Sequence, residues 1–284
     1  MTIFLLFFGL MVPGAQAQVH VSSISAASAG TGRAAVEPLD TPFLNPAALP
    51  YSPGYYFGMG YSVLRSSNPQ GSDVLALALT DNLPETVIPT TLAFVQEKHE
   101  ENGTAGVRKD LRLGVGNFIV GRNALGLGLA YRMAQSEFTS TTQQLNMFAG
   151  TMVAINKELS VALVLENILP PSNATPEPDR LSPSTSLGLS YNFRTVMRAK
   201  LDVISEGNNS FGRPTVAFGL ENYWNRWLIF RVGVSHNSEL AQNIASAGAG
   251  FGGPRFGIHY AFQNIQGPDG TDPRHSVDLS VPIW

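Results

Sequence analysis

The stretch LGLGLAYRM, residues 125–133, places a large side chain at every second position and a glycine, alanine or arginine between them. Successive side chains of a β-strand point to opposite faces of the sheet. A period of two therefore predicts a strand with one apolar face and one face of small or polar residues. The same alternation recurs at 111–115, 161–165, 187–193, 216–220, 228–234 and 256–262. We expect an all-β protein.

About fourteen such segments follow residue 54, each near the nine to eleven residues that a tilted membrane-spanning strand needs. We expect them to begin near Tyr55, Asp73, Thr90, Lys109, Asn123, Thr142, Leu159, Ser184, Val196, Arg213, Trp227, Ile244, Arg255 and Arg274. An even number of antiparallel strands is typical of a closed barrel in a bacterial outer membrane. The predicted fold is a transmembrane antiparallel β-barrel of about 14 strands, formed by residues 55–284.

The connections between these segments also indicate a membrane barrel, because such barrels join short periplasmic turns with longer external loops. Short links are expected at 121–122, 156–157, 194–195, 225–226 and 252–254. Longer polar connections are expected at 96–108, 135–141, 170–183, 205–212, 236–243 and 263–273. Segment 81–89 is the exception, since it is longer than a hairpin although its order makes it periplasmic.

Aromatic residues gather at the short links, and Trp and Tyr favour the membrane interface. We expect a periplasmic aromatic girdle, with Phe193 and Phe251 beside Tyr223, Trp224, Trp227 and Trp284. The competing interpretation is that these are ordinary hairpin aromatics of a soluble β-sandwich. One-sided strands with connections that alternate in length favour the membrane barrel over the sandwich.

Composition excludes several other classes of protein. The chain has no cysteine, which excludes a disulfide scaffold, a thiol nucleophile and a Cys-ligated metal site. Its net charge of −3 supplies no basic face for nucleic acid. The five histidines are not grouped with a nucleophile and an orienting group, so we expect neither an enzyme nor a cofactor. A membrane barrel without cofactor or nucleic-acid partner fits this composition.

The N-terminal residues predict export. The apolar run at 3–12 and the following Ala15-Gln16-Ala17 indicate a signal peptide, residues 1–17, cleaved near Ala17. The run is too short for a transmembrane helix, which needs roughly 20 residues. An uncleaved core segment is the rival interpretation. No Lys or Arg precedes the run, so the true start can lie upstream.

Segment 30–49, GTGRAAVEPLDTPFLNPAAL, has neither a strand nor a helix period. Its three prolines break regular structure, and its glycines permit close turns. Residues 18–54 are therefore expected to form a plug inside the barrel, with Arg33, Glu37 and Asp40 paired to charges of the wall. The inward rows carry those charges: Arg112, Arg132, Glu166, Arg198, Lys200, Asp202, Glu221, Arg231, His259 and Asp278.

The inward rows leave two questions open. Each of these charged residues can alternatively line a solvated interior instead of holding a plug. Inward glycines lower the bulk of the wall and leave room for a plug, a ligand path or both; they are Gly114, Gly116, Gly126, Gly128 and Gly219.

GTGRA at 30–34 followed by FLNPAAL at 43–49 resembles the N-terminal hatch of the FadL-type outer-membrane transporters. The resemblance implies a fourteen-stranded barrel that takes up long-chain fatty acids or aromatic hydrocarbons. It extends to the PorV-type accessory barrels of type IX secretion, which share the fold. The hatch and gate residues that it implies are Gly30, Gly32, Arg33, Asn45, Pro46 and Ala47.

The sequence also departs from this family. Its outer loops reach only about fourteen residues, and none has the long apolar segment expected for capturing a fatty acid. Ile168, Leu169 and Leu181 are the candidates for an apolar mouth, and Trp284 lies out of step with the usual terminal aromatic of an assembly signal.

We expect a monomer in outer-membrane lipid that passively takes up a hydrophobic small molecule, with movement of 45–49 opening the path. The main alternative is a non-transporting scaffold or secretion accessory whose loops bind a secreted or surface protein. A small polar porin is the third possibility.

Overall fold

The computed structural model describes residues 20–283, except 66–70, 102–103, 137–138, 171–179, 195, 208–211 and 269. The signal peptide expected at residues 1–17 and the girdle residue Trp284 lie outside the described residues. Within the described part of the chain, no helix is long and apolar enough to cross a membrane.

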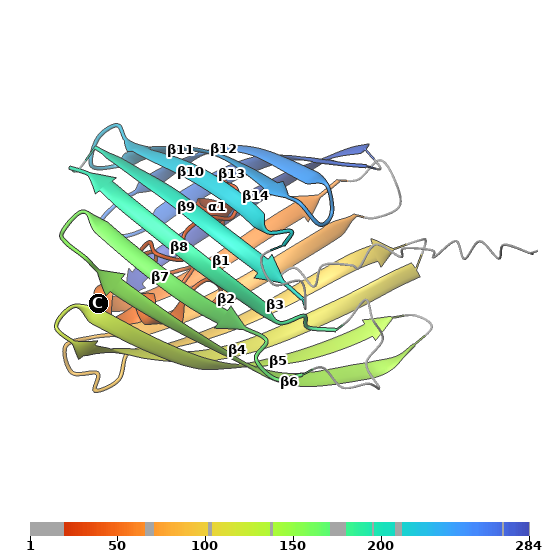
Figure 1. Ribbon diagram of the computed structural model, residues 1–284, viewed down its shortest axis with the longest axis horizontal. Helices are drawn as coiled ribbons and strands as arrows, with labels where there is room; N and C mark the ends of the chain where they lie inside the picture. Colours follow the sequence, from red (N-terminus) through yellow and green to blue (C-terminus); the bar gives the residue numbers. More distant parts are fainter. Residues whose placement is uncertain are drawn as a thin grey trace, which may run out of the picture.

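Fourteen strands form one closed antiparallel barrel, as the alternating sequence predicted. The barrel closes where the first strand pairs with the last, from Tyr55 opposite Ile283 to Leu64 opposite Arg274. Figure 1 shows the strands tilted against the long axis of the molecule. The strands are β1 (Gly54–Leu64), β2 (Ser72–Asn82), β3 (Thr90–Glu101), β4 (Thr104–Val120), β5 (Asn123–Ser136), β6 (Thr139–Ala154), β7 (Leu159–Glu166), β8 (Ser184–Phe193), β9 (Met197–Glu206), β10 (Thr215–Tyr223), β11 (Leu228–Asn237), β12 (Gln242–Gly252), β13 (Gly257–Gly267) and β14 (Gly270–Ile283).

Three of the six long polar connections expected outside the barrel are wrong: 96–108, 135–141 and 263–273. Residues 96–101 and 104–108 belong to strands rather than to a loop, because β3 and β4 remain paired as far as Glu101 and Thr104. Likewise, β13 and β14 pair as far as Gly267 and Gly270, inside the expected loop 263–273. Polar residues continue a strand readily where its neighbour continues beside it, so polarity alone misplaced these strand ends. The connection between β7 and β8 is long, as expected.

The outer face of the barrel is apolar. Exposed Leu, Val and Phe side chains alternate with buried small or polar residues along most strands, as in Leu125, Leu127 and Leu129 of β5, which are 39%, 47% and 44% exposed. Such a continuous apolar surface is typical of a barrel face that contacts the hydrocarbon of a membrane. The leucine rows that revealed the strands therefore form the face that lipid would contact.

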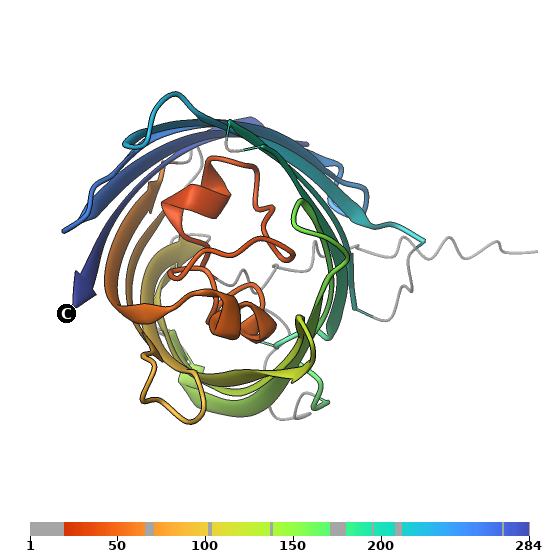
Figure 2. The same ribbon diagram turned by 90° about the vertical axis from the view of Figure 1, so that its left-hand side faces the viewer.

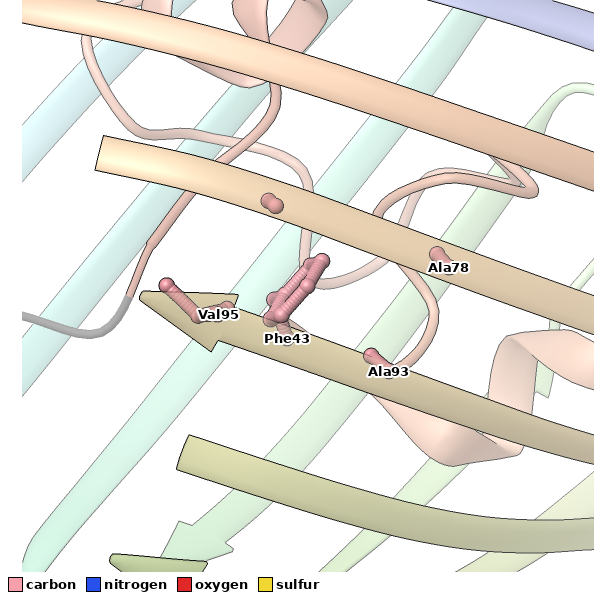
Figure 3. Packing of buried hydrophobic residues seen from close by; sticks show 5 residues of the cluster. Phe43, Ala78, Ala93 and Val95 are labelled. Atoms are coloured by element: carbon pink, nitrogen blue, oxygen red, sulfur yellow. The ribbon is translucent and has the colours of Figure 1, made fainter. Parts of the chain in front are cut away.

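Residues 20–52, which we call the plug, lie inside the ring of strands (Figure 2). Two short helices shape the plug: α1 (Ser23–Ala26), capped by the Ser22 side chain, and the 3-10 helix η1 (Pro46–Tyr51), capped by the Asn45 side chain. Proline at the first position of η1 suits a helix start, because its missing N–H would have no partner there. Phe43 packs against Ala76, Ala78, Ala93 and Val95 of the wall (Figure 3).

Candidate functional site

We call the residues before Asn45 the first half of the plug and those after it the second half. The first half is attached to the wall by charged residues. The Asp202 carboxylate on β9 accepts hydrogen bonds from the backbone N–H groups of Gly32 and Arg33, at 2.9 and 3.2 Å. It also pairs with the Arg33 guanidinium at 3.1 Å. Asp278 on β14 accepts from the Ser23 backbone N–H at 2.5 Å. Both carboxylates are buried, so their partners are required to offset the cost of desolvation.

A second set of charges lies where β9, β10 and β11 begin or end at the short turns. Glu221 pairs with Lys200 at 2.6 Å and lies 3.7 Å from Arg198 and 3.8 Å from Arg231. Arg198 in turn pairs with Glu37 of the plug at 2.6 Å. Arg231 also contacts the ring of His259 at 3.2 Å. The mixed signs seen in the sequence are thus combined in one buried network that includes the plug.

The second half of the plug is attached by close packing against glycine. Gly116, Gly126 and Gly150 lie opposite one another on β4, β5 and β6 and form a row across three strands. A Cβ at Gly116 or Gly126 would collide with the backbone of Pro46 or Ala47, and one at Gly150 would collide with the Asn45 side chain. This glycine row is therefore the surface on which η1 rests.

Glycines also bring the wall close to the first half of the plug. Added Cβ atoms at Gly219 and Gly233 would overlap with Ser28 and its neighbours. At these positions the inward glycines accommodate the plug rather than an open path. The sequence showed the glycines at alternate positions, but it could not show that they align across strands.

The structure brings the predicted hatch residues together only in part. Asn45 lies between the two halves, because its side chain caps η1 at Ala47 and also donates to the Arg33 carbonyl oxygen at 2.8 Å. Gly30 and Gly32 have φ of 84° and 144°, a region that favours glycine. Of the three expected ion-pairing residues, Arg33 and Glu37 pair with the wall. Asp40 instead accepts from the Ser22 backbone N–H of the plug itself.

Two other wall arginines face the lumen nearer the loop end. Arg112 pairs with Glu166 at 3.0 Å, donates to the Phe43 carbonyl oxygen at 3.3 Å and lies 4.6 Å above the Phe148 ring. Arg132 makes a two-pronged contact with Asp110, at 2.6 and 2.7 Å. Asp110 was missed because the sequence placed it at the edge of an expected loop. Arg112 contacts the plug, whereas the Arg132–Asp110 pair joins two strands of the wall.

The cavities found among the described residues are small. One of about 40 Å³ is bordered by His20, Glu97, Arg108, Asp110, Arg132 and Arg274, together with smaller residues. A second, of about 10 Å³, lies beside Asn167 and Leu181. By comparison, an apolar cavity of roughly 150 Å³ binds benzene. With the plug in place, these spaces are too small for a hydrocarbon.

Burial shifts the pKa of three titratable groups of the plug, and it raises that of Tyr51 at the end of η1. Burial raises the pKa of the Asp40 carboxyl to about 7, against the hydrogen bond from Ser22. Burial, with a smaller effect of the nearby Arg274, lowers the pKa of His20 to about 4. At neutral pH His20 is therefore neutral, and Asp40 is close to its midpoint.

The wall is incomplete beside β7. This strand has 8 residues, whereas the neighbouring β6 has 16. The two pair only from Ala149–Leu165 to Ala154–Ser160. Beyond that point, side chains hold the connection to β6: Asn146 bonds both backbone groups of Leu169, and Gln144 accepts from the Leu181 N–H. Ile168 there is 45% exposed, and Leu181 is buried.

The aromatic girdle expected at the short turns needs one correction. Trp224 is 74% exposed, and the Trp227 ring stacks on Phe251 with centroids 6.1 Å apart. Tyr223 does not face outward: its hydroxyl donates to Glu221, and Arg198 lies over its ring. Its neighbour Trp224 occupies the opposite parity, so one residue of the pair had to face the lumen.

The fold of this chain is similar to that of several solved structures. No family model and no curated protein matches the chain. Its structure resembles the toluene transporter TbuX of Ralstonia pickettii, with a TM-score of 0.76 and 10% identity over 93% of this chain and 98% of that one. It also resembles the monoaromatic hydrocarbon channel CymD, with a TM-score of 0.73 and 12% identity over 95% and 99% of the two chains. A Pseudomonas aeruginosa FadL homologue gives 0.70, with 11% identity over 95% and 100%. The fold is thus the FadL-type barrel fold that the N-terminal motif indicated.

Proposed function

We propose that this chain is a bacterial outer-membrane barrel that lets hydrophobic small molecules pass passively, without cofactor or catalytic residue. The apolar outer face supports placement in lipid, and the FadL-type fold supports transport. Two of the similar structures are named for toluene and monoaromatic hydrocarbons, so a small aromatic hydrocarbon is the substrate class that we favour.

The single observation that carries the route is the incomplete wall beside β7. The connection at 167–170 and 181–183 closes this section largely through the side chains of Asn146 and Gln144, with one backbone bond from Ile168 to Met147. The small cavity beside Asn167 and Leu181 lies directly behind it. Displacing this connection would open a lateral path between the lumen and the lipid.

For the same reason, we place the gate elsewhere than at residues 45–49, where the sequence led us to expect it. Residues 45–49 are wedged onto the glycine row and are almost completely buried. Moving them would expose a large apolar surface, whereas moving the connection breaks a few hydrogen bonds and uncovers one buried leucine, Leu181. We therefore assign the moving part to residues 167–170 and 181, with the plug as the fixed floor of the path.

A reversible crosslink tests this assignment. Cysteines at Met147 and Ile168 would join the connection to β6, because the Ile168 N–H already donates to the Met147 carbonyl oxygen at 3.1 Å. Uptake of radiolabelled toluene by cells should fall several-fold when the pair is oxidised and return on reduction. The matched control places the pair at Leu127 and Ala149, partners in a continuous ladder. Equal uptake in both redox states of the first pair would refute the lateral route.

A non-transporting scaffold is the second candidate. The two-sided attachment of the plug and the small cavities favour it, because both describe a barrel that is closed along its axis. If this function is correct, the purified protein transports toluene in neither redox state. Replacing 170–183 would then abolish capture of a surface protein while the barrel still assembles.

A further inference from the structure

One end of the barrel carries a regular set of basic residues. The turns that follow β4, β6, β8, β10 and β12 are short, and each contributes one cationic side chain: Arg122, Lys157, Arg194, Arg226 and Arg255. All five are exposed. Among the described residues of these turns, Glu158 is the single acid. We call these five residues the basic arc.

The charges of the basic arc are not neutralised by acids among the described residues. None of its members forms an ion pair with a residue that the structure describes, in contrast to the buried arginines of the lumen. At the opposite end, cations alternate with acids, as in the Arg108–Glu97 pair at 3.5 Å. The excess of positive charge is therefore confined to one end of a chain whose net charge is −3.

The basic arc adjoins the edge of the apolar outer face. Arg226 lies 4.6 Å above the Trp227 ring, and Arg194 lies 5.7 Å from the Phe193 ring. Trp224 and Phe193 are exposed, and the leucine and phenylalanine rows begin immediately beyond them. Aromatic rings of this kind mark the depth of lipid headgroups. The cations consequently stand at the level where headgroup phosphates would lie.

We propose that the basic arc binds the headgroups of anionic phospholipids in the leaflet at the short-turn end. Guanidinium and ammonium groups donate to phosphate oxygens, and the cations of the arc have no ion pair among the described residues that such binding would break. The turn after β2 lacks a cation and carries Glu85, with Asp81 near the end of the strand, so this lipid shell covers an arc rather than a ring. The inference rests on the membrane placement proposed above.

Tryptophan fluorescence can measure this preference, because Trp224 and Trp227 lie within the basic arc. The protein, carrying Trp284→Phe, is reconstituted in bilayers that contain either brominated phosphatidylglycerol or brominated phosphatidylcholine. Bromine quenches a nearby indole, so the ratio of quenching reports the local enrichment of the anionic lipid. We expect clear enrichment at low salt and its loss at 0.5 M salt, because screening shortens the reach of surface charge to a few ångströms, roughly 3 Å at 1 M.

Two matched variants locate the effect. The turn variant combines Arg122→Gln, Lys157→Gln, Arg194→Gln and Arg255→Gln, and it keeps Arg226 so that the surroundings of Trp227 do not change. The loop variant combines Arg65→Gln, Lys98→Gln, Lys109→Gln and Arg213→Gln, four exposed cations away from the arc. Enrichment should fall at least about fivefold in the turn variant, the contribution of one cation at a membrane surface, and stay unchanged in the loop variant.

The outcomes separate the two proposals. Equal enrichment in the turn variant and the parent, or an equal loss in both variants, overturns the basic arc as a lipid site. If the turn variant does not fold, the salt dependence of the parent decides, because salt-independent quenching also overturns it. An absence of quenching by either brominated lipid would instead contradict the membrane placement itself.

Discussion

The two halves of the plug are held in different ways. The first half meets β9 and β14 through buried carboxylates that accept its backbone N–H groups. The second half rests on a row of glycines with no charge between the two surfaces. Ionic attachment is specific but depends on every partner being present, whereas close packing depends on the shape of the wall. This difference predicts that each half can be loosened separately.

The largest effect is expected at the ionic attachment. Asp202→Ala would leave the Arg33 guanidinium buried without its partner, which typically costs about 3–5 kcal/mol. Because the chain has no cysteine, Ser28→Cys and Ala48→Cys provide unique reporters for the first and second halves. Maleimide labelling should accelerate by about 100-fold or more at position 28 and remain slow at position 48.

Asp110→Ala is the control for this change. It removes one partner of Arg132, but that ion pair lies within the wall and does not involve the plug. The barrel should lose stability while position 28 stays protected. Equal acceleration at both reporters in Asp202→Ala would show that the plug moves as one body and would end the comparison.

The converse change is made at the packed attachment. Gly126→Ala places a methyl group against the backbone of Pro46 and Ala47, and overpacking of this kind costs about 1–3 kcal/mol. Labelling should now accelerate at position 48 and not at position 28. Gly267→Ala serves as the control, because nothing lies within 4 Å of an added Cβ there. A change in thermal stability as small as that of the control would contradict the close contact.

Asn45 tests whether the halves are coupled. Asn45→Ala removes the cap of η1 and the bond to the Arg33 carbonyl oxygen, with an expected cost of about 1 kcal/mol. Combined with Asp202→Ala in a double-mutant cycle of thermal unfolding, its effect should differ from the sum of the single changes, since Asn45 and Asp202 both bind Arg33. Strict additivity would mean that the halves are independent.

The smallest expected effect is a dependence on pH. The Asp40 carboxyl has a pKa of about 7 in the folded protein, above the usual 3.8, because of burial. The packed plug therefore prefers the neutral form, and the stability that this preference contributes falls as the pH rises from 3.8 to about 7 and levels off above that. Between pH 6.5 and 8.5, where His20 stays neutral, the loss of stability is roughly 1 kcal/mol. The labelling rate at position 28, divided by the rate of the same reporter in Asp40→Asn, should be higher at pH 8.5 than at pH 6.5. An equal ratio at the two pH values would contradict this role of Asp40.

The period of two was sufficient to predict the strands, because a lipid-facing side must be apolar at every second residue wherever it occurs. It also predicted which wall charges face inward, since parity decides the face. The prediction failed where a loop was inferred from polar residues alone. Residues 96–101 and 104–108 of the loop expected at 96–108 are paired strand. Tyr223 was misplaced for a related reason. Its residue type suggested the outer girdle, but it lies two residues from Glu221 and therefore on the same, inward face of the strand.

The partners of the buried charges could not be predicted. Asp202 and Arg33 are 169 positions apart, and their contact depends on the register of strands between them. The same holds for Gly116, Gly126 and Gly150, which become one surface only when three strands align. The shortness of β7 also escaped prediction, because its apolar alternation resembles that of full-length strands.

The bond from Ser23 to Asp278 has a consequence for assembly. It joins the beginning of the described chain to its last strand, across 255 positions. The contact can form only after β14 is made and lies beside the plug. A chain that emerges with its plug first must therefore hold that segment undocked until this strand is in place. Insertion of the final strand is the event that allows the first residues to settle, so docking of α1 reports that the last strand has arrived.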